Sequence, residues 1–139
     1  MLKIIVYTDG GARGNPGPAG AGVVIQEGEK VLAEVKQFVG AHQTNNWAEY
    51  EAVIIAYGKL FELMLRDRDI EFRLDSLLVV EQLIGNWKIK DAGLKQQVER
   101  VKSLAKDFGN VTYFHIPREK NTEADRLVNE AIDESVATH

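Results

Sequence analysis

Four acidic residues lie where the surrounding pattern calls for apolar side chains, and no other feature of the sequence constrains the fold as much. Asp9 and Asp75 each end a short run with strand character, whereas Glu49 and Asp125 lie on the apolar stripes of two helical segments. A lone carboxylate on a buried face either takes up a proton or carries a large desolvation cost. We therefore expect the fold to bring the four carboxylates together around a shared cation.

The residue types around these carboxylates favour a hard cation. The sequence contains no Cys and only three His, so we expect Mg²⁺ or Mn²⁺ rather than zinc. Each acid also has a simpler interpretation: Glu49 can complete a capping box, Asp75 can cap a helix, and Asp125 can interact with a helix dipole. These alternatives do not explain why all four fall where elements are expected to converge.

Length and composition predict an ordinary globular protein. The chain of 139 residues is long enough for a real core and predicts a single domain over residues 1–139. No apolar run approaches the ~20 residues of a membrane span, and no signal-peptide pattern is present. The absence of Cys fits a reducing compartment. We expect a cytoplasmic monomer with no membrane association and no obligate protein partner.

The charge distribution is compatible with binding to nucleic acid, although the net charge of the chain is −4. Two acidic residues, Asp91 and Glu99, lie in a stretch that carries six basic ones: Lys88, Lys90, Lys95, Arg100, Lys102 and Lys106. Trp87 begins this stretch and is either a core or helix-end residue or a platform for a sugar or base. The stretch is the candidate surface for phosphate contacts.

The periodicity predicts the element order βββαβααβα. Strands are expected at residues 2–8, 21–26, 31–39, 70–74 and 111–116, and helices at 46–65, 77–84, 92–108 and after Asn121, which can cap the last one. Asn45 and Asn46 are candidate caps of the first helix. The segment 10–18 is either a long turn or a loop in which Gly10 and Gly11 admit a polymer backbone. The order predicts an α/β fold with a mixed sheet, helices on both faces, and a site at the carboxyl ends of strands.

Four sequence segments carry a resemblance to a known family. They are residues 7–11 with 14–17 (YTDGG and GNPG), residues 44–49 (TNNWAE), residues 75–76 (DS), and residues 121–125 (NTEAD). On these segments the chain resembles type 1 ribonuclease H along nearly its whole length, in a compact, archaeal-like form without the basic protrusion. The resemblance implies a ribonuclease H-like fold with a five-stranded mixed sheet.

The resemblance also implies an activity and a site. It implies an endonuclease that hydrolyses the RNA strand of RNA/DNA hybrids by two-metal-ion in-line attack and leaves 3′-hydroxyl and 5′-phosphate ends. Asp9, Glu49, Asp75 and Asp125 would hold two Mg²⁺ or Mn²⁺ ions with substrate bound. The groove-contacting residues would be Asn15, Asn45 and Asn46. Independently of the resemblance, the basic stretch makes Trp87, Lys88 and Lys90 candidates for substrate contact. Double-stranded RNA is a second candidate substrate. A silent hybrid-binding or dsRNA-binding module and a junction resolvase are the alternatives.

The chain departs from the family pattern in three places. The stretch that would carry the protrusion is only residues 85–93, and Leu77 stands where many relatives have Gln. His115 aligns with the family's mobile histidine but falls in a strand pattern. Arg118, after the break at Pro117, is therefore expected to reach the phosphate in its place.

Overall fold

The computed structural model describes residues 2–137, and its elements follow the predicted order. The strands are β1 (Ile4–Ala12), β2 (Gly17–Glu27), β3 (Lys30–Gln43), β4 (Asp69–Leu74) and β5 (Asn110–His115). The helices are α1 (Asn45–Glu62), α2 (Leu77–Leu83), α3 (Ala92–Ala105) and α4 (Thr122–Ala137), with a 3₁₀ turn, η1 (Arg118–Lys120), before α4. None of the helices in this part of the chain is both long and apolar enough to cross a membrane.

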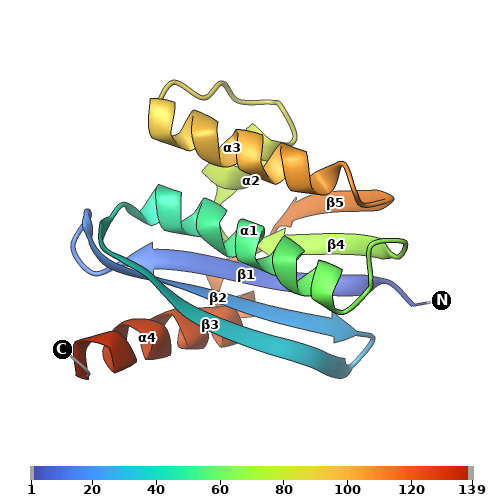
Figure 1. Cartoon of the computed structure of the whole chain (residues 1–139), viewed down its shortest axis with the longest axis horizontal. Coiled ribbons are helices and arrows are strands. Elements are labelled where there is room, and N and C mark those ends of the chain that lie inside the picture. The colour runs from blue at the N-terminus through green and yellow to red at the C-terminus, as the bar shows by residue number, and fades with distance from the viewer. Residues whose placement is uncertain (1, 138–139) are drawn as a thin grey trace.

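The five strands form one mixed sheet in the order β3-β2-β1-β4-β5. The pairs β1–β2 and β2–β3 are antiparallel, whereas β1–β4 and β4–β5 are parallel. This arrangement confirms the predicted fold class. It also places the carboxyl end of β4 beside Thr8, within β1, in the middle of the sheet (Figure 1).

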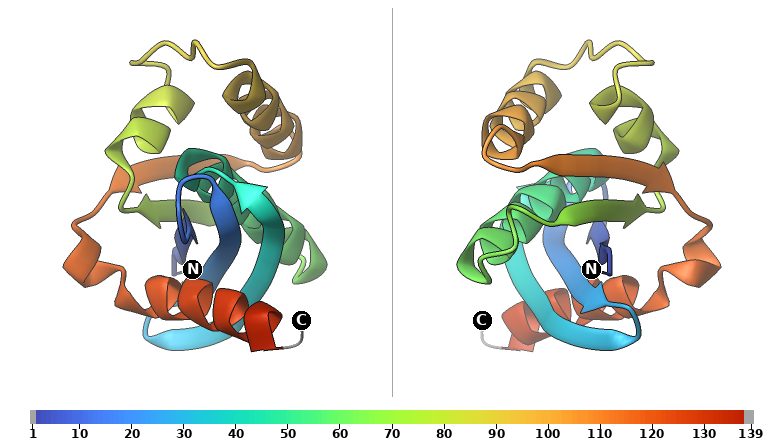
Figure 2. Two further views of the ribbon diagram at one scale, coloured as in Figure 1. Left: turned by 90° about the vertical axis from the view of Figure 1, so that its left-hand side faces the viewer. Right: turned by 90° about the vertical axis from the view of Figure 1, so that its right-hand side faces the viewer.

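Helices cover both faces of the sheet (Figure 2). α1 packs across β1 and β2 on one face and α3 packs on α1, whereas α4 covers β2 and part of β1 and β3 on the other face. The core between the sheet and α1 contains the buried aromatic side chains Tyr50, Tyr57 and Phe72. Tyr57 and Phe72 have ring centroids 4.9 Å apart. The core therefore anchors α1, the helix that carries Glu49.

The structure corrects several predicted boundaries near the site. Most of the predicted loop 10–18 belongs to β1 and β2, which pair as far as Ala12 and Ala19, so the connection is only residues 13–16. Neither predicted asparagine caps α1; Thr44 does, because its Oγ1 accepts a hydrogen bond from Trp47 N at 3.2 Å. The helices predicted at 46–65 and 92–108 end earlier, at Glu62 and Ala105.

Candidate active site

Three of the predicted carboxylates converge where β4 ends beside β1. Asp9 follows Thr8, which pairs with Leu74 of β4, and Asp75 follows Leu74 directly. Glu49 reaches the same point from the N-terminal part of α1. One oxygen from each of the three carboxylates lies within 4.8 Å of the other two. We call Asp9, Glu49 and Asp75 the carboxylate cluster.

Two glycines allow helices to approach Asp9. A Cβ atom on Gly10 would lie 2.2 Å from the backbone oxygen of Ala48, so β1 touches the backbone of α1 there. A Cβ atom on Gly22, which pairs with Asp9, would lie 2.2 Å from the backbone oxygen of Ala124 at the start of α4. Gly10 is thus buried against α1, and its lack of a side chain permits that contact. The sequence interpretation missed Gly22, although a Gly between apolar strand residues is a signal of close approach.

Burial makes the charged forms of the cluster costly. Asp9 and Glu49 are each only 6% exposed, and burial raises the pKa of Asp9 to about 7. Burial also raises the pKa of Glu49 well above its ordinary value, and the neighbouring Asp9 adds to that shift. The pKa of Asp75 is raised mainly by burial, while a hydrogen bond from Asn121 acts in the opposite direction. Without a cation, the cluster therefore holds protons near neutral pH.

The donor set of the cluster fits a hard divalent cation. All three side chains offer carboxylate oxygens, and Glu49 Oε2 is buried without a hydrogen-bond partner. A buried oxygen of this kind needs a donor or a cation to offset its desolvation. Oxygen-only ligands suit Mg²⁺ or Mn²⁺ rather than zinc. The cluster therefore offers an all-oxygen set of candidate metal ligands.

Asp125, the fourth predicted carboxylate, lies at the rim rather than inside the cluster. It belongs to the first turn of α4 and is exposed. Its charge nevertheless contributes to raising the pKa of Asp9, so the two side chains are close. A cavity of about 260 Å³ joins Asp125 to Asp9 and Glu49, and Arg118 also lines it. The cavity opens the buried cluster to solvent on the side of α4.

The sequence interpretation did not assign Asn121 to the site. Its Nδ2 donates to Asp75 Oδ2 at 3.2 Å and to the backbone oxygen of Thr8 at 2.9 Å, and the side chain is 1% exposed. Its Oδ1 has no partner, so Asn121 does not cap α4 through its side chain as predicted. The sequence could have indicated this position, because Asn121 precedes Asp125 by four residues and residues at that spacing lie on the same face of a helix.

The three asparagines predicted to contact the substrate groove lie beside the site. The side chains of Asn15 and Asn45 form hydrogen bonds within the protein. Asn45 Oδ1 accepts from Ala12 N at 2.7 Å, and Asn15 Oδ1 accepts from Asn45 N at 3.0 Å. These bonds tie the β1–β2 connection to the start of α1. Asn46 and Asn15 also line a separate groove of about 470 Å³ that runs between Thr44 and α3. Gly11 is half-buried, and a Cβ there would meet only ordinary contacts.

The candidate substrate contacts Trp87, Lys88 and Lys90 lie on the loop between α2 and α3, residues 84–91. This loop is short and is hydrogen-bonded to α2. Trp87 N and Asn86 N both donate to the backbone oxygen of Glu81 at the end of α2. Trp87 is 44% exposed, which argues against a core role, and Lys88 and Lys90 are fully at the surface. Arg100, which belongs to the same basic stretch, instead pairs with Glu51 of α1 at 2.6 Å. The loop thus presents a ring and two ammonium groups to solvent.

His115 and Arg118 both lie close enough to Asp75 of the cluster to act on its charge. His115 is the last residue of β5, where it pairs with Leu74, and Arg118 begins η1. Both charges oppose the increase in the pKa of Asp75, and the effect of Arg118 is the larger. Arg118 also lines the cavity beside Asp9, whereas His115 does not. His115 is therefore held by the sheet, as its strand pattern predicts.

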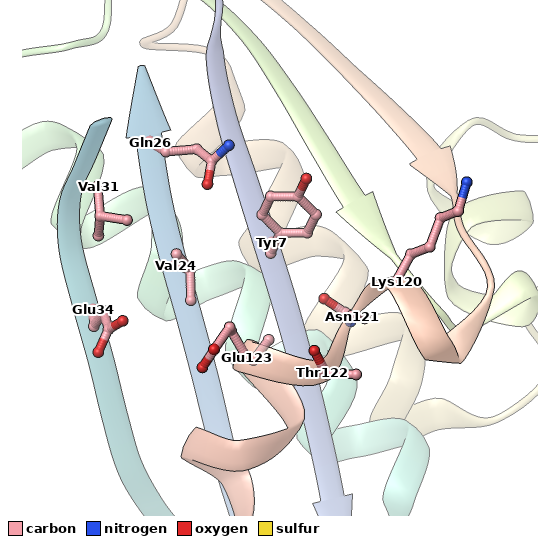
Figure 3. A pocket seen from close by; sticks show the side chains of 10 residues that line it. Tyr7, Val24, Gln26, Val31, Glu34, Lys120, Asn121, Thr122 and Glu123 are labelled. Atoms are coloured by element: carbon pink, nitrogen blue, oxygen red, sulfur yellow. The ribbon is translucent and has the colours of Figure 1, made fainter. Parts of the chain in front are cut away.

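A third pocket, of about 310 Å³, lies on the face of the sheet beside the start of α4 (Figure 3). Tyr7, Val24 and Gln26 line it from the sheet, and Asn121 lines it from the segment that leads into α4 (Figure 3). None of the cluster carboxylates lines this pocket. Asp9 and Glu49 of the cluster therefore face the smaller cavity and not this pocket.

The strand order and the carboxylate cluster beside the carboxyl end of β4 define a ribonuclease H-like fold with a candidate metal centre. The family model described as "Reverse transcriptase-like" matches residues 7–131. "Ribonuclease H" of Ruthia magnifica is 36% identical over 149 residues, which cover 96% of this chain and 97% of the relative. The chain belongs to the ribonuclease H family of enzymes, and its short α2–α3 connection places it with the type 1 forms that lack the basic protrusion.

Two further proteins are similar over nearly the whole chain. The "Bifunctional protein Rv2228c" of Mycobacterium tuberculosis is 42% identical over 134 residues, which cover 95% of this chain. That match covers only 36% of the mycobacterial protein, so this chain spans about a third of that relative's length. The crystal structure of LC11-RNase H1 in complex with an RNA/DNA hybrid has a TM-score of 0.91 and 46% identity, covering 96% of this chain and 99% of that one.

Proposed function

We propose that this chain is a metal-dependent endoribonuclease that hydrolyses the RNA strand of RNA/DNA hybrids. The observation that carries the proposal is the carboxylate cluster. Asp9, Glu49 and Asp75 offer oxygens within 4.8 Å of one another, and one oxygen of Glu49 has no partner. A group of buried acids that destabilise one another is characteristic of a site that binds cations.

The proposed metal ligands are the cluster and Asp125. These four carboxylates would hold two Mg²⁺ or Mn²⁺ ions, since Glu49, Asp75 and Asp125 all act on Asp9 at short range. Bound in this way, a pair of ions would stabilise the attacking and the leaving oxygens of an in-line displacement. Such a displacement leaves a 3′-hydroxyl and a 5′-phosphate.

The chain's own residues would orient the scissile strand. Arg118 lines the cavity beside Asp9 and can hold a phosphate through two parallel hydrogen bonds. It cannot exchange protons at neutral pH, so its role is to position charge. Asn121 holds Asp75 in place through its amide. Because Asp9 and Glu49 are buried, bulk water would be excluded from the protein side of the reacting group.

The proposed substrate is a hybrid duplex because the relative LC11-RNase H1, 46% identical, was crystallised with an RNA/DNA hybrid. The groove lined by Asn15 and Asn46 lies next to the β1–β2 connection, where it can follow one strand of a duplex. Polar side chains can recognise the 2′-hydroxyl groups of the RNA strand without reading sequence. Lys88 and Lys90 on the α2–α3 loop would contact phosphates.

A silent binding module is the alternative that the cluster argues against. Clustered carboxylates repel phosphate groups, so binding alone gains nothing from them. Cleavage of double-stranded RNA remains the second candidate activity. The shallow grooves of A-form RNA and of a hybrid are similar in shape, and the same polar contacts could serve both.

One gel tests the proposal and separates these alternatives. RNA/DNA hybrid, double-stranded RNA, single-stranded RNA and double-stranded DNA of one sequence are incubated with the protein in Mg²⁺, in Mn²⁺ and in EDTA. We expect internal cuts in the RNA strand of the hybrid, only when a metal is present. Binding of the hybrid without cleavage in either metal would support the silent module and refute the proposal.

A further inference from the structure

Asp125 is the one proposed ligand whose orientation is not fixed by burial. It is exposed at the start of α4, whereas Asp9 and Glu49 are each 6% exposed. An exposed aspartate samples several rotamers, and holding it in one of them costs conformational entropy. Another side chain is therefore needed if the Asp125 carboxylate is to remain directed at Asp9.

Asn129 lies one helical turn after Asp125 and contacts it twice. Its Nδ2 donates to the backbone oxygen of Asp125 at 3.0 Å and lies 3.5 Å from the carboxylate oxygen Oδ2. Both residues line the cavity that contains Asp9. The amide is neutral, so it can direct the carboxylate without cancelling the charge that a cation requires.

Arg13 fixes which end of the Asn129 amide faces Asp125. Its Nη2 donates to Asn129 Oδ1 at 3.2 Å, and its Nη1 donates to Asp133 Oδ1 at 2.5 Å. A guanidinium offers only donors, so the amide oxygen must face Arg13 and the amide NH₂ must face Asp125. Arg13 belongs to the β1–β2 connection, and these bonds therefore hold α4 to the loop that follows Asp9.

We infer that Asn129 and Arg13 are positioning residues that hold the Asp125 carboxylate toward Asp9 and thereby set the affinity of the site for a divalent cation. The inference rests on the proposed function, because it takes Asp125 to be a ligand. Residues behind a ligand typically change metal affinity by about 10- to 100-fold when they are removed. Asn129→Ala and Arg13→Gln are each expected to weaken cation binding by about tenfold.

A purely structural role for Asn129 makes a different prediction. The bond from Asn129 Nδ2 to the Asp125 backbone oxygen is a local helix contact, and its loss would lower stability without changing cation affinity. Asn110 provides a matched control, since its Nδ2 donates to Asp69 Oδ1 at 3.1 Å at the opposite end of β4 from the cluster. Asn110→Ala removes an equivalent amide–carboxylate bond far from the site.

The test is calorimetric titration of Mn²⁺ into the whole protein without nucleic acid. Wild type, Asn129→Ala, Arg13→Gln, Asp125→Asn and Asn110→Ala are compared, together with the double variant Asp125→Asn/Asn129→Ala. Urea unfolding in EDTA is measured for each to separate stability from affinity. We expect about tenfold weaker binding for Asn129→Ala and Arg13→Gln, no change for Asn110→Ala, and no further loss when Asn129→Ala is added to Asp125→Asn.

Two outcomes would overturn the inference while leaving the proposed function intact. One is wild-type Mn²⁺ affinity in Asn129→Ala, with or without a loss of stability. The other is a loss of the same size in the Asp125→Asn background, which would show that Asn129 acts independently of Asp125. Failure of the proposed function would appear differently, as no Mn²⁺ binding by the wild type or undiminished binding by Asp9→Asn.

Discussion

Asn121 donates from its side-chain amide to Asp75 Oδ2 at 3.2 Å, although 46 residues separate the two in the chain. The same NH₂ group donates to the backbone oxygen of Thr8 at 2.9 Å. One buried amide thus connects the start of α4 to β1, next to Asp9, and to Asp75 just after β4. Its Oδ1 is buried without a partner.

Two substitutions at Asn121 are expected to lower the free energy of unfolding by different amounts, because both remove the donated hydrogen bonds but only one adds a carboxylate. Asn121→Asp loses both donated bonds and places a second carboxylate against Asp75. Asn121→Leu loses the same bonds but also removes the unpartnered oxygen, so we expect it to cost about 1–3 kcal/mol. In EDTA at pH 7, urea unfolding should show Asn121→Asp to be less stable than Asn121→Leu by at least about 1 kcal/mol. Equal losses would mean that Asp75 carries no charge there.

The metal-free protein is expected to lose stability as the pH rises. Burial raises the pKa of Asp9 from 3.8 to about 7, so between those values the folded protein holds a proton that the unfolded chain has released. The stabilisation is complete below about pH 4 and is lost as the pH passes about 7. Urea midpoints in EDTA should therefore fall from pH 5 to pH 8.

The control for this pH titration is a variant that lacks the Asp9 carboxylate. Asp9→Asn should show a flatter pH dependence and an equal or higher midpoint at pH 8, whereas Asp107→Asn, which is exposed beyond α3, should follow the wild type. Saturating Mg²⁺ should stabilise the wild type more at pH 8 than at pH 5, because ligands bind deprotonated. A pH dependence in Asp9→Asn as steep as that of the wild type would contradict the assignment.

The α2–α3 loop and the first turn of α3 are expected to bind substrate phosphates. Replacing Lys88, Lys90 and Lys95 with Ala should raise KM for a hybrid, leave kcat nearly unchanged, and reduce the slope of log KM against log salt concentration by up to about 0.9 per lost contact. Lys30→Ala, at the start of β3 and the opposite end of the sheet, is the control. An unchanged slope in the triple variant would place the binding face elsewhere.

Arg118 is expected to matter more for turnover than His115. Arg118 lines the cavity beside the cluster, whereas His115 is paired with Leu74 at the end of β5. We expect Arg118→Ala to lower kcat on a hybrid at least about tenfold, or ~1.4 kcal/mol, more than His115→Ala does. Arg118→Lys, which keeps the charge but not the planar fork, should fall between wild type and Arg118→Ala. A larger loss for His115→Ala would return the role to the histidine.

The sequence predicted the element order and the position of Glu49, because both depend on local periodicity. The apolar stripe of α1 carries Glu49 inward whatever the rest of the chain does. The extension of β1 to Ala12 could not be predicted in the same way. Glycines and a proline are typical of loops, but here pairing with β2 and contact with α1 and α4 keep the Gly-rich segment in the sheet.

The contacts around the carboxylates were beyond the reach of sequence patterns. The bond between Asn121 and Asp75 joins segments 46 residues apart, and the bond between Arg13 and Asn129 joins segments 116 residues apart. Spacing along the chain carries no information about such pairs, which depend on how closely α4 approaches the sheet. Asp125 was expected among the buried ligands, but the first turn of α4 leaves it exposed at the rim.

Single-turnover cleavage of an RNA/DNA hybrid by Asp9→Asn tests the central claim most directly. Asp9 lies among the other three proposed ligands, and an amide cannot offset the charge of two cations. The account predicts that the variant binds the hybrid as the wild type does but shows no measurable cleavage in Mg²⁺ or Mn²⁺. A variant that retains more than about a tenth of the wild-type rate would contradict the assignment of the carboxylate cluster as the catalytic metal site.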